Sequence, residues 1–405
     1  MSRKLWWAYL LAALTGIGPL AAAQEPADLA GQPIRRIVVF RPGMPQAQAI
    51  VLLQQAGAKV VQELHLINAV AVEFPSSAFQ AVELNLTSNE NVVRVDKDYK
   101  RRWIESEPAT IEGVALPSLQ SIIQPYRARP AKAALPWGIN RVNAPAAWKV
   151  TKGAGVKVAV IDTGIDTSHP TLKPNIKGGI NCVDANKADD FNDDQGHGTH
   201  VSGTIAGVGD AKGVTGVAPA VDLYGVKVLD AQGSGTVAGV IAGIQWAADH
   251  HMDVANMSLG SDESDQSLAD AVAAASKAGL AIIAAAGNSS GPVGYPAAYP
   301  ECIAVSASDK SDQIASFSSF GPQVAVIAPG VNIYSTYMGG GYKTLSGTSM
   351  ATPHVTGLAA LAVAAKGVHG SDALRAALTQ AASPLQGLSP EQQGAGLVDA
   401  KKLVR

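Results

Sequence analysis

The spacing of apolar residues predicts a small α/β unit over residues 34–98. Its strands are expected at residues 34–40, 60–64, 69–74 and 92–95, where apolar residues run together or alternate with polar ones. Helices are expected at residues 45–56 and from Pro75 to about Leu84. The resulting order, βαββαβ, is the ferredoxin-like pattern.

A different pattern begins near Leu135, where continuous apolar runs rich in β-branched residues alternate with alanine-rich helical segments. These runs lie at residues 156–161, 221–229, 254–259, 280–286, 303–307 and 324–328. They predict an α/β domain at 135–405 with a parallel sheet that helices flank on both faces. Residues 99–134, with Pro108, Pro117, Pro125 and Pro130, are predicted to be a linker without a core.

The N-terminus has the layout of a secretory signal peptide. Arg3 and Lys4 precede an apolar stretch from Leu5 to Leu20, which is shorter than the roughly 20 residues that a membrane-spanning helix needs. Small residues at 21–23 predict cleavage after Ala23, so 1–23 is the signal peptide and the mature protein is expected to be secreted or periplasmic.

Composition and charge narrow the class of protein. Of the 405 residues, 47% are hydrophobic and 16% are charged, which excludes a disordered chain. The net charge of −2 indicates no nucleic-acid partner. It divides unevenly, because residues 34–104 carry a net charge of +3 and residues 133–405 a net charge of −5. Opposite signs favour docking of the small unit on the large one.

Ser349 is a candidate nucleophile. Gly347 and Thr348 lead into a helical run from Ser349 to about Ala365, so Ser349 falls in the first turn of a helix. The N–H groups and dipole there stabilise an oxyanion formed when a serine attacks a carbonyl. The alternative is a serine that only caps the helix, which is the commoner role for a serine taken alone.

A nucleophilic serine needs a base and an orienting carboxylate. His197 lies between two glycines that leave room for a substrate, and Asp162 ends an expected parallel strand, where such folds place their sites. His197 and His200 could instead bind a metal, but no third ligand follows at the usual spacing, and His200 is expected to be an internal, hydrogen-bonded side chain. Asp162-Thr163-Gly164 also marks aspartic proteases, which pair two such carboxylates, whereas this chain has one such motif.

Asn288 is a candidate second donor to the oxyanion. It follows the expected strand 280–286 through Gly287, and its side-chain amide could complete the site with the Ser349 N–H. Taken alone, Gly-Asn after a strand is ordinarily a turn.

In the order Asp, His, Asn, Ser, these residues resemble the subtilisin family of serine proteases. The matching segments are VAVIDTGIDTSHP (158–170), GHGTHVSGTIAG (196–207), AAAGN (284–288) and GTSMATPHVTG (347–357). The resemblance extends from about Leu135 to residues 394–400, and residues 34–98 resemble the family's inhibitory propeptide. It implies that Ser349 is the nucleophile, that His197 is the base, and that Asp162 orients the imidazole. Asn288 is then the oxyanion-hole asparagine.

The resemblance also implies a subtilisin-like, secreted serine endopeptidase that is made as a self-processing zymogen. Its substrates would be proteins and peptides, its chemistry would need no cofactor, and its own propeptide would be an intramolecular inhibitor. The maturation site is expected between Trp103 and Ala134. We expect a monomer with no membrane partner after signal cleavage.

By the same resemblance, two segments pair with the substrate backbone as strands, and small residues line the pocket for P1, the residue before the scissile bond. The strand-pairing residues are Gly233, Ser234, Gly235, Ser258, Leu259 and Gly260, the P1 pocket residues are Ala285, Ala286, Gly287 and Gly294, and Val237 and Val240 resemble the wall for P4. Small neutral walls predict a preference for a large uncharged P1 residue and an apolar P4 residue.

Other reaction classes and roles fit less well. An esterase or lipase would place its serine in Gly-x-Ser-x-Gly, whereas Ser349 lies in Gly-Thr-Ser-Met-Ala. A non-catalytic binding protein would be favoured by loss of a reactive residue, yet all four are present. Residues 34–98 alone could form a dedicated protease inhibitor, but the attached catalytic domain favours an intramolecular role.

A structural calcium ion is a further implication, at the loop that contains Val208, Asp210, Lys212 and Val214. Thr171 stands where the family usually has an aspartate ligand, and the loss of a carboxylate should weaken such a site. The acidic segment of Asp189, Asp190, Asp193 and Asp194 is either a separate cation site or a solvated loop. Cys182 and Cys302 are expected to remain free thiols, because the family's sheet would place them too far apart for a disulfide.

Overall fold

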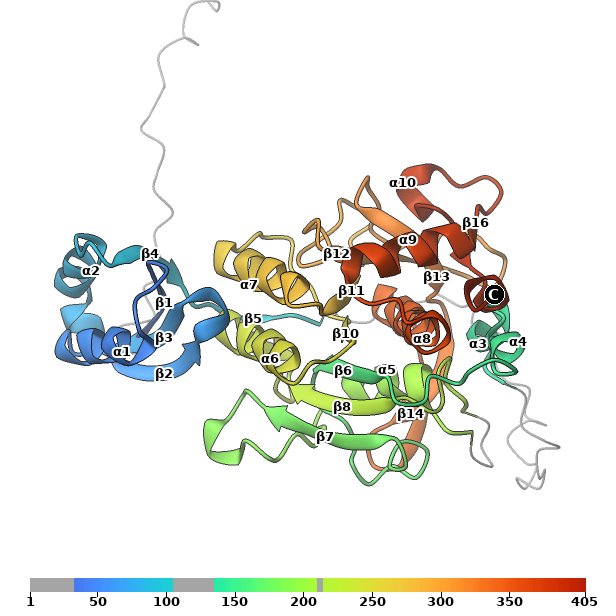
Figure 1. Ribbon diagram of the computed structural model, residues 1–405, viewed down its shortest axis with the longest axis horizontal. Coiled ribbons are helices and arrows are strands. Elements are labelled where there is room, and N and C mark those ends of the chain that lie inside the picture. The colour runs from blue at the N-terminus through green and yellow to red at the C-terminus, as the bar shows by residue number, and fades with distance from the viewer. Residues whose placement is uncertain (1–32, 105–134, 210–213) are drawn as a thin grey trace, which may run out of the picture.

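The computed structural model describes residues 33–104, 135–209 and 214–405, which form a small N-terminal unit beside a larger one (Figure 1). The predicted signal peptide, 1–23, and most of the predicted linker, 99–134, lie outside the described residues. In the three described ranges, no helix has the length and apolar character needed to cross a membrane.

The N-terminal unit has the predicted βαββαβ order. Its elements are β1 (Ile34–Phe40), α1 (Gln46–Gln55), β2 (Lys59–Leu64), β3 (Ala69–Phe74), α2 (Phe79–Thr87) and β4 (Val92–Lys97). The strands form an antiparallel sheet in the order β2-β3-β1-β4. Successive side chains of these strands point to opposite faces of the sheet. Val38 and Val70 pack toward α1 and α2, whereas Ile37 and Ala71 belong to a hydrophobic cluster shared with the larger unit.

The larger unit contains a nine-stranded sheet in the order β16-β17-β13-β12-β11-β10-β6-β8-β7. Its strands are β6 (Lys157–Asp162), β7 (Ile176–Asn181), β8 (Asp222–Lys227), β10 (Val254–Met257), β11 (Ala281–Ala285), β12 (Cys302–Ser308), β13 (Val324–Pro329), β16 (Ala382–Ser383) and β17 (Leu397–Val398). All neighbouring pairs are parallel except β16 and β17. Four short strands form two-stranded sheets outside it, namely β5 (Lys100–Arg102), β9 (Ser234–Thr236), β14 (Ile333–Tyr337) and β15 (Gly341–Leu345).

Helices cover both faces of the large sheet, as the sequence predicted (Figure 1). The long helices are α5 (His197–Ala206), α6 (Val237–Asp249), α7 (Gln266–Lys277), α8 (Thr348–Lys366) and α9 (Ser371–Ala381), and the short ones are α3 (Trp137–Arg141), α4 (Ala144–Ala147), α10 (Pro390–Gln393) and α11 (Ala400–Leu403). Each face of the sheet packs on its own hydrophobic cluster, and the side chains of β6 alternate between the two. Val158 and Val160 belong to the cluster around α5 and α8, and Ala159 and Ile161 to the cluster around α6 and α7.

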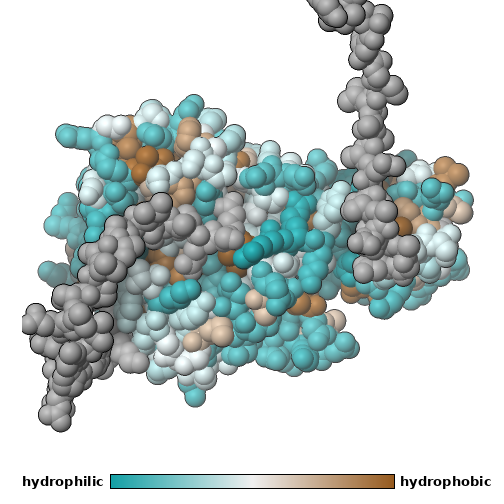
Figure 2. Space-filling view, turned by 180° about the vertical axis from the view of Figure 1, so that it is seen from behind, coloured by the Kyte–Doolittle hydropathy of each residue, from teal (hydrophilic) through white to brown (hydrophobic). Residues whose placement is uncertain are grey.

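Glycines allow two of these helices to pack closely. A Cβ atom at Gly243 of α6 would lie 2.5 Å from Val228 Cγ1, and one at Gly357 of α8 would lie 2.5 Å from Val217 Cβ. Both contacts are too short for any side chain, so the helices can sit this near only with glycine. Figure 2 shows hydrophilic residues over most of the visible surface, with hydrophobic residues in small separate patches.

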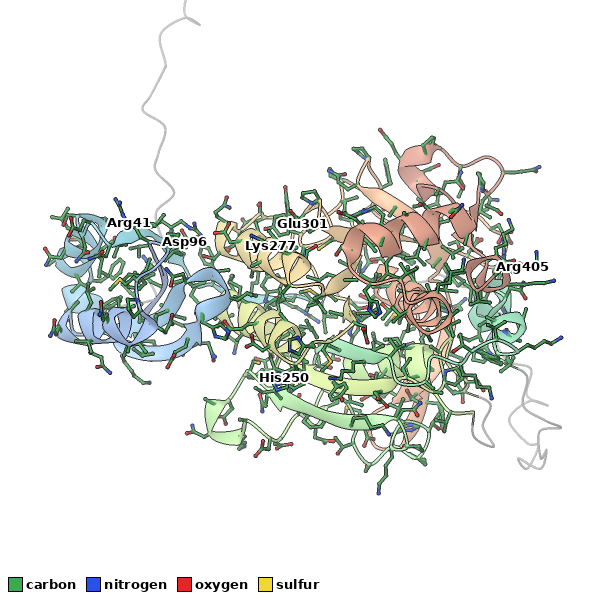
Figure 3. The ribbon with its side chains drawn as sticks, in the orientation of Figure 1. Arg41, Asp96, His250, Lys277, Glu301 and Arg405 are labelled. Atoms are coloured by element: carbon green, nitrogen blue, oxygen red, sulfur yellow. The ribbon has the colours of Figure 1, made fainter. Side chains whose placement is uncertain are left out.

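The N-terminal unit docks on the N-termini of α6 and α7. Asp98 Oδ1 accepts a hydrogen bond of 2.9 Å from the backbone N–H of Ala238 in α6. Asp96 Oδ2 accepts one of 2.6 Å from the Ser267 hydroxyl in α7, and Asp96 lies at the boundary between the two units (Figure 3). Both carboxylates therefore lie where the helix dipoles favour negative charge.

The two cysteines lie far apart across the sheet. Cys182 directly follows the edge strand β7, and Cys302 begins β12, with four strands between them. Five strand spacings amount to about 24 Å, well beyond the reach of a disulfide. Both cysteines are free, as the sequence predicted.

Two buried histidines predict that the larger unit loses stability in mild acid. Burial lowers the pKa of His200 to about 3 and the pKa of His354 to about 4, from an ordinary value of 6.5. In the unfolded chain each histidine takes up a proton near pH 6.5, whereas in the folded protein both stay neutral until the pH nears their lowered pKa values. The free energy of unfolding is therefore unaffected above about pH 6.5 and falls below it, by about 1.4 kcal/mol per pH unit for each histidine. Thermal melts of an inactive variant should show a Tm that changes little between pH 7.5 and about 6.5 and falls from there to pH 4.5.

The matched comparison replaces one titrating group. A His354→Gln variant, measured on the same inactive background, should show a shallower dependence of Tm on pH than its parent. Equal slopes for the two proteins would mean that His354 does not take up a proton on unfolding.

Candidate active site

Three of the residues predicted for the site lie at or just after the carboxyl ends of neighbouring strands, at one edge of the sheet. Asp162 is the last residue of β6, Ser258 directly follows β10, and Asn288 follows β11 by a short turn. The chain runs from β6 toward β7 on one side and later from β10 toward β13 on the other. The residues therefore gather at the switch point of an open α/β sheet, where ligands bind in such folds.

His197 contacts Asp162 directly. Its Nδ1 lies 2.9 Å from Asp162 Oδ1 and 3.0 Å from Oδ2, and both side chains are buried. Because the carboxylate accepts from Nδ1–H, the tautomer that this contact favours leaves Nε2 unprotonated, as a general base requires. His197 is the first residue of α5, so the helix begins at the histidine itself.

Asp193 and Lys227 fix the backbone around Asp162 and His197, and neither role was predicted from the sequence. The buried Asp193 carboxylate accepts hydrogen bonds from the backbone N–H groups of Gln195, Gly196 and Thr199, which fixes the turn into α5. It is neither a solvated residue nor a free cation ligand. The buried Lys227 ammonium donates to the carbonyls of Thr163 and Leu229 and to Asp194 Oδ1.

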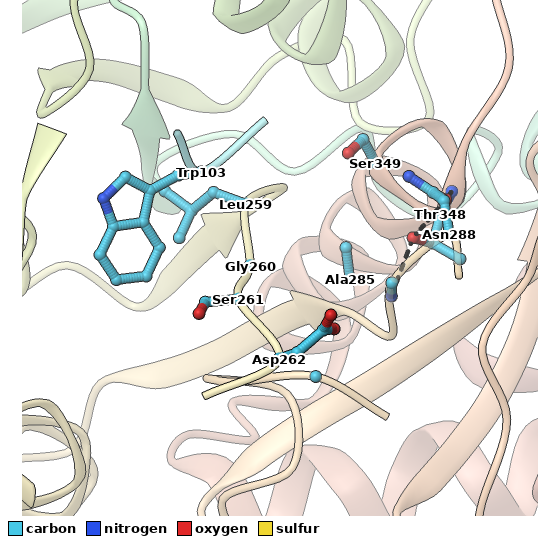
Figure 4. Close-up of a pocket in the computed structure, with 11 residues that line it drawn as sticks. Trp103, Leu259, Gly260, Ser261, Asp262, Ala285, Asn288, Thr348 and Ser349 are labelled. Carbon is cyan, nitrogen blue, oxygen red and sulfur yellow. Dashed lines mark hydrogen bonds between the residues drawn. The ribbon is translucent and has the colours of Figure 1, made fainter. Parts of the chain in front are cut away.

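Ser349 lies in the first turn of α8, as predicted, with Asn288 beside it (Figure 4). Its hydroxyl donates to the Ser258 carbonyl at 3.1 Å, and the Ser258 hydroxyl donates to the Ser349 carbonyl at 2.8 Å. Asn288 Oδ1 accepts from the Thr348 N–H at 2.8 Å and from the Thr348 hydroxyl at 3.0 Å. These bonds fix the amide so that its Nδ2–H₂ side is left for another acceptor.

Two N–H donors border one small space next to Ser349. A Cβ atom built on Gly347 would lie 3.6 Å from the Ser349 backbone nitrogen and 3.7 Å from Asn288 Nδ2. Asn288 Oδ1 lies equally far from that point, at 3.7 Å, but it already accepts from Thr348, so the groups near this open space with a hydrogen to donate are the Ser349 N–H and the Asn288 Nδ2–H₂. The arrangement can stabilise a negative charge that develops on an oxygen in this space.

A pocket opens beside these donors (Figure 4). It is lined by Trp103, Leu259, Gly260, Ser261, Asp262, Ala285, Gly287, Asn288, Gly294, Thr348 and Ser349. Of the residues predicted for the P1 pocket, Ala285, Gly287 and Gly294 are among them. Trp103, Ser261 and Asp262 were not predicted, because no local motif marks them as pocket residues.

The chain's own residues pair with the predicted substrate-binding segments. Strand β5 runs antiparallel to β9, with Arg101 opposite Gly235 and Arg102 opposite Ser234. The Trp103 N–H donates to the Gly233 carbonyl at 2.9 Å, and the Gly260 N–H donates to the Trp103 carbonyl at 3.0 Å. This part of the predicted linker is therefore an ordered strand between the two segments.

The side chain of Trp103 fills an apolar site beside this strand. It is 2% exposed, and its indole N–H donates to the Gly235 carbonyl at 2.9 Å. Val237 and Val240, predicted as the P4 wall, are fully buried and belong to the same apolar cluster as Trp103 and Leu259.

The predicted calcium loop is only partly described. Asp210 and Lys212 lie outside the described residues, the Val214 carbonyl accepts from the Gly209 N–H, and the Thr171 hydroxyl contacts the Tyr342 hydroxyl at 2.7 Å. The described residues contain no group of three or more His, Cys, Asp or Glu side chains that could hold a metal ion.

His200, the alternative metal ligand, is an internal residue. Its Nε2 lies 3.0 Å from the Ile333 carbonyl and 3.1 Å from the Lys343 carbonyl, and its side chain is fully buried. The prediction of a hydrogen-bonded core histidine is confirmed.

Comparison with known proteins gives one consistent family. The subtilase family model matches residues 153–396. The chain is 40% identical over 362 residues to an alkaline protease of Shouchella clausii, covering 86% of this chain and 93% of that protein. It is 47% identical over 273 residues to subtilisin Savinase of Lederbergia lenta, covering 67% and 99%, and 40% identical over 372 residues to subtilisin E of Bacillus subtilis (strain 168), covering 89% and 88%.

Proposed function

The chain belongs to the subtilase family of serine endopeptidases, and we propose that it hydrolyses peptide bonds through Asp162, His197 and Ser349. The observation that carries this assignment is the contact of 2.9 Å between His197 Nδ1 and Asp162, at the edge of the sheet where Ser349 lies in the first turn of α8. Ser349 Oγ attacks the carbonyl carbon of the scissile bond, and His197 Nε2 takes the hydroxyl proton. Asp162 stabilises the imidazolium that forms.

The negative charge of the tetrahedral intermediate falls on the former carbonyl oxygen. The Ser349 N–H and the Asn288 amide border the space that this oxygen would occupy, and both are held in place before the substrate arrives. The imidazolium then gives its proton to the leaving amine as the C–N bond breaks, which leaves an acyl-enzyme on Ser349. His197 then takes a proton from a water molecule as its oxygen attacks the ester carbonyl. The imidazolium gives that proton to Ser349 Oγ as the acyl C–O bond breaks, which releases the acid product and restores the serine.

We propose that the protein is made as a self-processing zymogen with a propeptide at 34–98, a maturation site within 99–134 and a catalytic domain at 135–405. The pairing of Lys100–Arg102 with β9 supports this division, because it blocks the segment expected to receive substrates. A signal peptide at 1–23 would direct the precursor out of the cytoplasm, and the mature enzyme would act as a monomer. A structural calcium ion at the 208–214 loop remains a prediction from the sequence, and no catalytic step depends on it.

The P1 pocket should favour large uncharged residues such as Phe, Tyr, Leu or Met. Ala285, Gly287 and Gly294 leave its walls small, and the one charged lining residue, Asp262, is exposed at its edge. The buried apolar cluster of Val237, Val240 and Leu259 should favour an apolar P4 residue. Cleavage of a peptide library by the mature enzyme, read by mass spectrometry, should show this preference. A dominant preference for Lys or Arg at P1 would contradict it, and no cleavage at all would contradict the proposed activity.

A further inference from the structure

The segment from Lys100 to Trp103 shows how an extended peptide lies along the catalytic unit. It forms an antiparallel ladder with β9 on one side and accepts a backbone hydrogen bond from Gly260 on the other. Backbone pairing of this kind does not depend on the side chains of the bound strand, so its surroundings show which substrate side chains the site accepts.

Two cationic side chains of this segment contact carboxylates of the catalytic unit. Lys100 Nζ lies 2.9 Å from Asp230 Oδ2, in the turn before β9. Arg101 Nη1 lies 2.5 Å from the Ser261 hydroxyl and 3.8 Å from Glu263 Oε2, in the loop after Gly260. The two carboxylates therefore stand on opposite sides of the bound strand.

Asp230 is positioned independently of Lys100. Its Oδ1 accepts hydrogen bonds of 3.0 Å from the backbone N–H groups of both Gln232 and Ser234, so the turn itself holds the carboxylate. Burial acts to raise the pKa of Asp230, but the hydrogen bonds from Lys100 and from these backbone groups outweigh it, and the pKa lies below its ordinary value. The backbone hydrogen bonds of the turn keep the carboxylate in place after the N-terminal unit leaves.

A third carboxylate adds to the negative potential. Asp262 lines the pocket that contains Ser349 and is exposed at its edge (Figure 4). Among the described residues, none forms a hydrogen bond or an ion pair with its side chain. The cleft upstream of the pocket is thus bordered by Asp230, Asp262 and Glu263.

We propose that the mature enzyme prefers substrates with Lys or Arg at the positions of Lys100 and Arg101. These positions are three and two residues before the residue that takes the place of Trp103. The inference rests on the proposed peptidase activity and adds a substrate class to it: peptides with a basic pair upstream of an apolar residue. The same carboxylates then bind basic side chains of the precursor's own segment first and those of substrates later.

Three internally quenched peptides test this preference. They share one apolar sequence with Trp at the position of Trp103, and they carry Lys-Arg, Ala-Ala or Glu-Glu at the positions of Lys100 and Arg101. With the mature enzyme at low salt, kcat/KM should fall in that order, with about 3- to 10-fold between Lys-Arg and Ala-Ala, since each partly exposed ion pair is worth up to about 1 kcal/mol. At 0.5 M salt the difference should shrink toward one, because the charges are screened.

Variants that remove one negative charge show which carboxylates cause the preference for the Lys-Arg peptide. Asp230→Asn keeps the oxygen that accepts from the turn, and Glu263→Gln keeps its size, so both should lose most of the preference for the Lys-Arg peptide over the Ala-Ala peptide. Glu301→Gln, at the start of β12 on the opposite edge of the sheet, should keep the preference and is the matched control (Figure 3).

The outcomes separate the two proposals. Equal cleavage of the Lys-Arg and Ala-Ala peptides by the wild type would show that these ion pairs serve only to dock the N-terminal unit, and it would overturn the inference alone. Failure to cleave any of the peptides, together with no cleavage in a random library, would instead refute the peptidase activity. A preference that survives in the double variant Asp230→Asn, Glu263→Gln would also reject the assignment.

Discussion

A Ser349→Ala variant is expected to accumulate as the unprocessed precursor and to hydrolyse peptides at least about 10⁴-fold more slowly than the wild type. The reason is that Ser349 Oγ is the only proposed nucleophile at the site, and the two oxyanion donors cannot form an acyl-enzyme without it. Electrophoresis of the purified protein with N-terminal sequencing measures processing, and a fluorogenic peptide measures turnover.

The substitution should leave the fold intact. The Ser349 hydroxyl makes a hydrogen bond to the Ser258 carbonyl, and its removal from a partly buried position should shift Tm by only a few degrees. Ser311→Ala, in an exposed turn before β13, is the control and should mature and turn over normally. Normal self-processing of isolated Ser349→Ala protein would show that another group cleaves the precursor.

Much of the fold was predictable from apolar patterning. The strands β1, β3, β6 and β13 fall within one residue of their predicted bounds, because each is a continuous or alternating apolar run that the core requires. The positions of Asp162 and Ser349 in the fold were also predictable, since one lies at a strand end and the other in the first turn of a helix that the same pattern locates.

Other elements depend on contacts that no local pattern reveals. Strand β7 contains Gly178 and Gly179 and is only partly buried, so it lacks the apolar run of a central strand. Strand β5 is the basic run Lys100–Arg102, which becomes a strand only because β9 pairs with it. A strand of this kind is set by its partner and not by its own propensity.

Buried charges were the least predictable part of the site. In the sequence, Asp193 is one of several neighbouring aspartates, and Lys227 is a single lysine within the apolar run at residues 221–229. Both are buried because the backbone groups of the surrounding turns satisfy them, and those turns meet only in the folded chain. An isolated charge in a sequence carries no signal of such partners.

An Asp162→Asn substitution is the second change with a large expected effect, a fall of about 10⁴-fold in kcat with little change in KM. Asparagine fits the same space, but its amide can donate to His197 Nδ1 and so favour the tautomer that carries its proton on Nε2. That nitrogen could then no longer accept the proton of Ser349. Steady-state kinetics on material matured by added wild-type enzyme, which is then removed, measures the effect.

The control lies at the other end of the same strand. Asp253 Oδ2 accepts from the Lys157 N–H at the start of β6, at 2.9 Å, so Asp253→Asn also neutralises a carboxylate that holds β6, but at the edge away from the site. It should keep kcat within about twofold of the wild type, because surface changes away from the reacting groups seldom alter more than local stability. If Asp162→Asn retained a similar kcat, the imidazole of His197 would not need this carboxylate, and the proposed role of Asp162 would have to be abandoned.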